Sequence, residues 1–159
     1  MNENGEVKIV VGNIFRAQWD AFVHCCNLYK RMGAGIAYIV ARDYPSVAEA
    51  DRQFPAMLGA FSSAVVEGRT FYNLYAQTGI GNDGNPENRN LRYDHLYDGL
   101  RRIAADVASR NGHKIALPWI GCGLAGGNRK AVLGIVEAVA EEFSDKGIEF
   151  TIYQIEPMV

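Results

Sequence analysis

The chain has 159 residues, of which 48% are hydrophobic and 21% are charged. Its formal net charge of −2 argues against a protein that coats duplex nucleic acid, because binding a polyanion usually needs a basic excess. The length predicts a single domain over residues 1–159 with a core of its own. The sequence has no apolar run of membrane-spanning length and no signal-peptide core, so we expect a cytoplasmic protein without a membrane or nucleic-acid partner.

The three cysteines, Cys25, Cys26 and Cys122, predict reduced thiols. Their number is odd, two of them are adjacent, and no C-x-x-C spacing occurs. Both a disulfide framework and a zinc site need other spacings. We therefore expect neither a bound metal nor a cofactor.

Short apolar segments alternate with segments of helical periodicity along the chain. Strands are predicted at 7–11, 21–25, 115–117 and 148–155, with a hairpin of 64–66 and 70–75 around a glycine turn. Helices are predicted at 34–42, at 47–53 with Ser46 as N-cap, and after the N-cap Asn128. A fourth helix has Leu96, Leu100, Ile103 and Val107 on one face. This alternation predicts an α/β fold with a mixed, largely parallel central sheet between helices.

Two glycine-rich segments follow predicted strands. The first runs from His24-Cys25-Cys26-Asn27 to Arg31-Met32-Gly33-Ala34-Gly35-Ile36-Ala37, and the second is Gly121-Cys122-Gly123-Leu124-Ala125-Gly126-Gly127. Each on its own is equally well read as a tight turn. Together, at the carboxyl ends of strands, they predict backbone N–H groups around a ligand with more than one phosphate.

Several side chains near these loops have both a structural and a functional interpretation. His24 is either a structural histidine or an acid, base or charge partner beside a phosphate. Asn27 either stabilises a turn or holds ribose hydroxyls with its amide. Trp119 either belongs to the core or stacks on an adenine.

Three stretches together resemble the macro domain, an ADP-ribose-binding α/β/α fold, over nearly the whole chain. They are Val11-Gly12-Asn13-Ile14-Phe15, the segment from Val23 to Tyr38 with the downstream Arg42-Asp43-Tyr44-Pro45, and Leu117 to Gly127. The second is most similar to the branch of ADP-ribose-1″-phosphate phosphatases. The third is also similar to relatives that remove ADP-ribose from protein glutamates.

The resemblance implies a three-layer sandwich with ADP-ribose in a cleft over the strand ends. The adenine would lie near Asn13 and Ile14, and the distal ribose would lie near Asn27. The diphosphate would lie between residues 33–36 and 121–124. The implied ligand-binding residues are Gly12, Asn13, Ile14, Asn27, Met32, Gly33, Ala34, Gly35, Ile36, Ala37, Trp119, Ile120, Gly121, Cys122, Gly123 and Leu124.

The chain departs from the family pattern at three positions. Asn13 stands where an aspartate usually contacts the adenine amine. Gln77 and Ala125 stand where the glutamate-linkage hydrolases have a catalytic lysine and aspartate. The covalent lysine route is therefore not available, whereas His24 matches a histidine of the phosphatase branch.

The leading hypothesis is a hydrolase of ADP-ribose 1″-phosphate or a related ADP-ribosyl conjugate, with His24 and Asn27 as catalytic residues. Its ligand would be ADP-ribose or ADP-ribose 1″-phosphate, and an ADP-ribosylated protein is a further candidate partner. The alternative is a non-catalytic module that binds or sequesters ADP-ribose or a derived signal. A binder of another nucleotide or of nucleic acid fits the near-neutral charge least.

Overall fold

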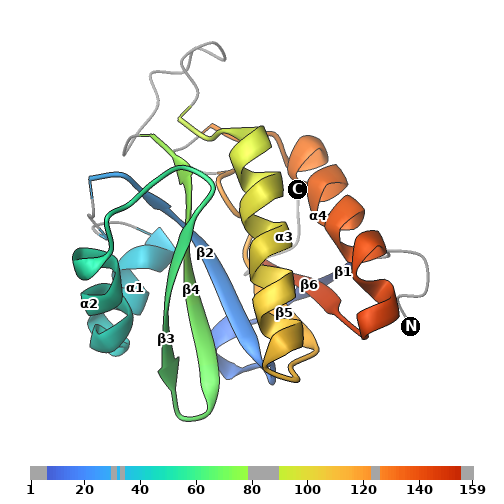
Figure 1. The fold of residues 1–159 in the computed structure, drawn as a ribbon, viewed down its shortest axis with the longest axis horizontal. Helices are drawn as coiled ribbons and strands as arrows, with labels where there is room; N and C mark the ends of the chain where they lie inside the picture. Colours follow the sequence, from blue (N-terminus) through green and yellow to red (C-terminus); the bar gives the residue numbers. More distant parts are fainter. Residues whose placement is uncertain (1–6, 30–31, 33–34, 79–89, 123–125, 155–159) are drawn as a thin grey trace.

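A six-stranded sheet forms the middle of the molecule (Figure 1). The computed structural model describes residues 7–29, 32, 35–78, 90–122 and 126–154. Across the sheet the strands follow the order β1-β6-β5-β2-β4-β3. Their bounds are β1 (Lys8–Val11), β2 (Ala21–Asn27), β3 (Phe61–Val66), β4 (Arg69–Gln77), β5 (Lys114–Leu117) and β6 (Glu149–Gln154). All neighbouring strands pair in parallel except β3 and β4, which form the expected hairpin.

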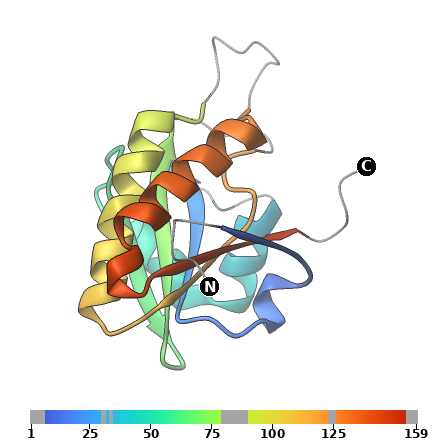
Figure 2. The ribbon, with the colours of Figure 1, turned by 90° about the vertical axis from the view of Figure 1, so that its right-hand side faces the viewer.

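Helices cover both faces of the sheet and make a three-layer α/β/α sandwich (Figures 1 and 2). On one face lie α1 (Gly35–Asp43) and α2 (Pro45–Gln53), and on the other lie α3 (Tyr93–Ser109) and α4 (Arg129–Glu142). Two short 3-10 turns, η1 (Ile14–Arg16) and η3 (Ser144–Lys146), complete the described elements. The predicted fold class is confirmed.

The central strands are apolar on both faces because each face is covered. In β2, Ala21 and Val23 pack in the core under α3 and α4, whereas Phe22 packs in the core on the α1 side. This pattern is typical of a parallel sheet buried between helices. It also means that a polar residue inside β2 or β4 enters a core and needs a partner there.

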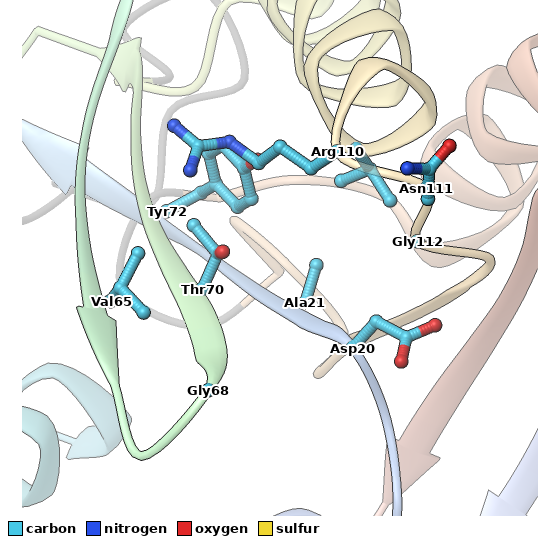
Figure 3. Close-up of a pocket in the computed structure, with 10 residues that line it drawn as sticks. Asp20, Ala21, Val65, Gly68, Thr70, Tyr72, Arg110, Asn111 and Gly112 are labelled. Atoms are coloured by element: carbon cyan, nitrogen blue, oxygen red, sulfur yellow. The ribbon is translucent and has the colours of Figure 1, made fainter.

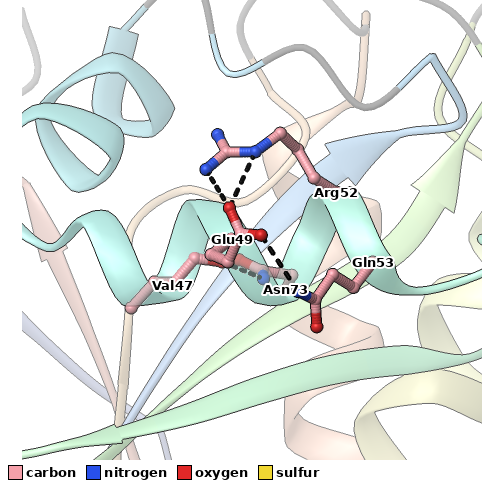
Figure 4. A network of polar contacts seen from close by, with 5 residues as sticks. All are labelled: Val47, Glu49, Arg52, Gln53 and Asn73. Atoms are coloured by element: carbon pink, nitrogen blue, oxygen red, sulfur yellow. Dashed lines mark hydrogen bonds and ion pairs between the residues drawn. The ribbon is translucent and has the colours of Figure 1, made fainter.

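The start of α2 corrects one prediction, because Ser46 does not cap this helix. The helix begins at Pro45, and the N-cap position is Tyr44, which makes no side-chain capping bond. A proline in the first turn has no N–H group to satisfy. Glu49 does not complete a capping box and accepts hydrogen bonds from Arg52 and Gln53 one turn further on (Figure 4).

The start of α4 agrees with its prediction. The side chain of Asn128 accepts a hydrogen bond from the N–H of Ala131 at 3.1 Å. Such a cap satisfies one of the N–H groups that the first turn leaves without an intrahelical partner. None of the helices in the described part of the chain has the length and apolar character needed to cross a membrane.

Two cavities lie at the amino ends of the parallel strands. One, of about 240 Å³, opens between the β3–β4 hairpin and the end of α3, where Asp20, Thr70 and Arg110 line it (Figure 3). The other, of about 230 Å³, is lined by Lys8 and Lys114 among others. Both are therefore remote from the carboxyl ends of the strands, where ligands of open α/β sheets bind.

Candidate functional site

Side-chain amides mark the carboxyl ends of four parallel strands. Gln154, Asn27 and Gln77 are the last residues of β6, β2 and β4, and Asn13 follows β1 by two residues. We call these four residues the amide row. The strand order places Asn13 and Gln154 at one end of the row and Asn27 and Gln77 at the other. A primary amide both donates and accepts hydrogen bonds, so the row suits hydroxyl groups and base edges.

Trp119 occupies the gap in this row after β5, which ends at Leu117. Its indole Nε1 donates a hydrogen bond to Oε1 of Gln154 at 2.9 Å. The guanidinium of Arg129, the first residue of α4, lies 5.1 Å from the centre of the Trp119 ring. The hydrogen bond and the cation–π contact together fix the orientation of a half-buried aromatic side chain at the strand ends.

In the second glycine-rich loop the backbones of Gly121 and Gly127 lie in close contact. The N–H of Gly127 donates to the carbonyl oxygen of Gly121 at 2.8 Å. A Cβ on Gly127 would lie 2.6 Å from that oxygen, and Gly121 has a φ of +69°. Both positions therefore need glycine for the loop to close.

The first glycine-rich loop enters α1 at Gly35, whose φ is +59°. Asn27 precedes this loop and is 6% exposed, and its Oδ1 accepts the N–H of Tyr29 at 2.9 Å. This hydrogen bond agrees with the predicted structural role of Asn27 in stabilising a turn.

His24 lies inside the core on the α1–α2 side of the sheet and has no exposed surface. Its Nε2 is 2.6 Å from Oδ1 of Asn73, the residue beside it on β4. The Asn73 amide nitrogen donates to the carbonyl of Val47 at 3.0 Å (Figure 4). It also donates to Oγ of Ser62 at 3.1 Å. Because the amide nitrogen faces these two groups, Oδ1 is the acceptor, so the proton of a neutral His24 lies on Nε2.

The hydrogen bonds continue from Asn73 to a buried carboxylate. Ser62 Oγ and the Tyr75 hydroxyl are 2.8 Å apart, and that hydroxyl donates to Oδ1 of Asp51 at 2.6 Å. Asp51 is 1% exposed and lies on α2. This network joins β2, β4, β3 and α2 through groups that would each be costly to bury alone.

Burial lowers the pKa of His24 from 6.5 to about 4, although the hydrogen bond that His24 donates to Asn73 acts in the opposite direction. The imidazole is therefore neutral at pH 7, and its Nδ1 is buried without a hydrogen-bond partner. A general base has to reach the proton it removes, directly or through one water. The burial of His24 therefore argues against the predicted catalytic role.

The thiols of the site are poor nucleophiles. Burial raises the pKa of Cys25 to about 12 and that of Cys122 to about 11, and it also raises the pKa of Cys26. Only the thiolate form attacks, so all three are unreactive near neutral pH. The described residues contain no cluster of three or more His, Cys, Asp or Glu side chains placed to hold a metal ion.

Comparison with known proteins identifies the fold. No family model matches the chain. The bovine (Bos taurus) ADP-ribose glycohydrolase OARD1 is 26% identical over 155 residues, which cover 97% of this chain and 95% of the relative. The macrodomain of Thermus aquaticus DarG superimposes with a TM-score of 0.74 at 21% identity, covering 94% and 98% of the two chains. This chain has the macro domain fold. The Trypanosoma brucei macrodomain, solved in complex with ADP-ribose, has a TM-score of 0.69 at 17% identity and covers 94% of this chain and 64% of its own.

The macro domain holds most of the predicted site residues at the carboxyl end of the sheet. Gly12 donates its N–H to the carbonyl of Gln154, and the exposed Asn13 caps η1 through a hydrogen bond from Phe15. Met32, Ile36 and Ala37 are half-buried at the start of α1. Gly33, Ala34, Gly123 and Leu124, together with Ala125, lie outside the described residues.

Two of the predicted ligand-binding residues are buried and expose little surface to a ligand. Ile14 is 6% exposed and Ile120 is 2% exposed, so both belong mainly to the cores. Sequence analysis also left Gln77 and Gln154 outside the predicted site. Each is a polar residue at the carboxyl end of a parallel strand. This shared position is the sequence feature from which they could have been predicted.

Proposed function

We propose that this macro domain binds ADP-ribose in a cleft over the carboxyl ends of its strands and hydrolyses an ADP-ribosyl conjugate. The observation that carries the proposal is the amide row between two glycine-rich loops at one end of a parallel sheet. The relatives support the same ligand: one is named an ADP-ribose glycohydrolase, and another holds ADP-ribose. An ADP-ribosylated protein is a further substrate candidate on the same grounds.

Within this proposal each part of the ligand meets a different kind of group. The adenine lies near Asn13 at the β1 end of the row. The diphosphate lies between the start of α1 and the second loop, where backbone N–H groups and the helix N-terminus favour negative charge. The distal ribose lies near Asn27, which we propose as the catalytic residue that orients the reacting end.

The finer proposal is that the substrate is ADP-ribose 1″-phosphate. A water oxygen bonds to phosphorus and the bond from phosphorus to the ribose oxygen breaks. The leaving ribose oxygen takes the proton that the water loses and becomes a hydroxyl. The segment around His24 and Asn27, which resembles the phosphatase branch, supports this substrate. Gln77 also supports it, since an amide cannot form the covalent adduct that a lysine forms.

Two measurements test the proposal. Calorimetry with ADP-ribose is expected to detect saturable binding, and incubation with ADP-ribose 1″-phosphate is expected to release phosphate. Asn27→Ala should abolish release, whereas Asn111→Gly, at the cavity on the opposite end of the sheet, should leave it intact. Absence of ADP-ribose binding in the unmodified protein would refute the proposal as a whole.

A second function, non-catalytic binding of ADP-ribose, is favoured by one specific observation. The chain has Gln77 and Ala125 where the glutamate-linkage hydrolases have lysine and aspartate. Tight binding of ADP-ribose without turnover of the 1″-phosphate or of an ADP-ribosylated protein would decide for this alternative.

A further inference from the structure

A cavity between the β3–β4 hairpin and the end of α3 lies outside the proposed ADP-ribose site (Figure 3). It opens at the amino ends of the strands, whereas both glycine-rich loops follow the carboxyl ends. Its volume is about 240 Å³, and a cavity that holds one water needs only roughly 10–15 Å³. Pockets for drug-sized ligands measure roughly 300–1,000 Å³. The cavity therefore has room for a small molecule or for one long side chain of a partner protein.

Thr70 contributes a buried hydroxyl group to the wall of this cavity. The residue lies beside Ala21 on the neighbouring strand and is 8% exposed. Its backbone N–H donates to the carbonyl oxygen of Asp20 at 3.0 Å, whereas its hydroxyl has no hydrogen-bond partner among the described residues. Figure 3 shows the side chain within the cavity, with its oxygen on the side of Ala21. A buried polar group without a partner is costly, so a ligand that bonds this hydroxyl would bind favourably.

Asp20 contributes a negative charge to the same wall. Its Oδ2 accepts the backbone N–H groups of His113 and Lys114 at 2.7 and 2.8 Å, and its Oδ1 has no hydrogen-bond partner among the described residues. Burial acts to raise the pKa of this carboxyl, but the two backbone hydrogen bonds and the nearby charges of His113 and Lys114 outweigh burial and lower the pKa. Asp20 is therefore ionised at neutral pH. One of its oxygens is held in place, and the other can accept a hydrogen bond from a ligand.

The cation in the wall of the cavity, Arg110, is already paired. Its Nε donates to Oδ2 of Asp106 at 2.9 Å, and the hydroxyl of Tyr72 donates to the same oxygen at 2.5 Å. Figure 3 shows Arg110 and Asp20 at opposite ends of the cavity. Lys114 lines the second cavity and not this one, and the carboxyl end of α3 adds the negative end of a helix dipole. The Asp20 end of the cavity therefore favours a positively charged ligand.

We propose that this cavity binds a primary ammonium group carried on a short alkyl chain. The ammonium donates hydrogen bonds to Oδ1 of Asp20 and to the hydroxyl of Thr70, and the alkyl chain packs against Ala21, Val65 and Val107, which line the cavity. An ammonium group has three N–H donors and no acceptor, so it matches a carboxylate together with a hydroxyl. A free alkylamine and a lysine side chain of a partner protein both carry this group. The proposal is independent of the ADP-ribose function, since the two sites share no residue.

Titration of the isotope-labelled protein with n-butylammonium at neutral pH, followed by NMR, tests the proposal. Saturable shifts are expected for the amide signals of Ala21, Thr70 and Gly112, which belong to the wall of the cavity. The compound n-butanol has a similar shape without the charge. It is expected to bind at least about tenfold more weakly, because a hydrogen bond to an ionised carboxylate is stronger when the donor is also charged.

Two variants assign the binding to the named groups. Thr70→Val keeps the shape of the side chain and removes its hydroxyl, so it should weaken n-butylammonium binding by about threefold to tenfold. Asp20→Asn removes the charge and should weaken binding by about tenfold or more. Thr151→Val, in the second cavity, is the matched control and should leave the affinity unchanged. Thermal unfolding of each variant establishes that it is folded.

A second ligand decides the source of the ammonium group. The N-acetyl, N-methylamide derivative of lysine presents the same ammonium group as a lysine side chain within a protein. If this derivative binds more tightly than n-butylammonium, the site takes a lysine of a partner protein. If it binds more weakly, the site takes a free amine.

The outcomes either support the proposal or overturn it. Saturable shifts in the wall of the cavity, with affinity lost in Thr70→Val and Asp20→Asn and kept in Thr151→Val, support it. Absence of saturable shifts at the three amides overturns it, and so does equal binding of n-butanol and n-butylammonium. Unchanged affinity in either folded variant, Thr70→Val or Asp20→Asn, also overturns it, since the ligand would then bind through other groups.

Discussion

Burial decides the chemistry of individual residues in this macro domain. His24 looks like an acid–base residue beside a glycine-rich loop, yet its imidazole is enclosed between β2 and the helices α1 and α2. Its partner Asn73 comes from a strand far along the chain, so no local pattern around His24 indicates the neutral tautomer. Strand alternation alone places His24 on the face opposite Cys25 and Asn27.

The titration of His24 makes stability depend on pH. Its pKa is about 4 in the folded protein and 6.5 when unfolded, so between these values the unfolded chain binds a proton that the folded chain does not. The contribution of neutral His24 to the free energy of unfolding is therefore fully present above pH 6.5. The free energy of unfolding should fall by on the order of 3 kcal/mol as the pH drops to 4.

Urea unfolding at several pH values between 4 and 7 measures this dependence. His24→Asn should flatten the dependence in this window, whereas the exposed His113→Asn should leave it as it is in the unmodified protein. An equal slope in the His24 variant would contradict the assignment.

At the scale of the element, two glycines close in sequence, Gly127 before α4 and Gly134 within it, differ in whether a side chain would fit. Gly127 sits where a Cβ would meet the backbone of Gly121, whereas Gly134 lies on the exposed side of α4 with open space around its missing Cβ. The same substitution should therefore have effects of opposite sign at the two positions.

Gly127→Ala is expected to destabilise the protein by about 1–3 kcal/mol, because backbone atoms have to move apart to admit the methyl group. Gly134→Ala should stabilise it by about 0.5–1 kcal/mol, since alanine has the higher helix propensity. Chemical denaturation of the two single variants measures both changes. Equal effects would mean that the loop tolerates a side chain at Gly127.

At the scale of the whole molecule, the two tryptophans report on opposite ends of the sheet. Trp19 is 5% exposed, lines the cavity at the amino ends of the strands, and is covered by the guanidinium of Arg69 at 4.1 Å from its ring. Trp119 lies at the carboxyl ends within the proposed site. A ligand over the strand ends should therefore affect only one of them.

Titration with ADP-ribose is expected to change the tryptophan fluorescence of the unmodified protein. The change should persist in Trp19→Phe and disappear in Trp119→Phe, because only Trp119 neighbours the ligand. Calorimetry on the same samples shows whether each variant still binds. A fluorescence change that survives in Trp119→Phe while binding persists would place the ligand elsewhere.

Much of this architecture is readable from local patterns. The strand over residues 21–25, the cap at Asn128 and the turn at Gly68 depend on residues close in sequence, so periodicity and capping rules predict them. The Ser46 cap fails because the first-turn proline sets the start of α2 two residues earlier than the capping motif predicts. The predicted fold class also follows from local patterns, because strands alternate with helices along the chain.

The sequence by itself determined the alternation of strands and helices and the two glycine-rich segments after strands. Only the tertiary structure decided which side chains share a surface. Parallel strands meet through crossovers, so the alignment of Asn27 with Gln77 and the burial of His24 against Asn73 depend on register between distant segments. Register depends on packing across the whole sheet, so no local pattern reveals that His24 bonds Asn73 or that Gln77 pairs with Asn27.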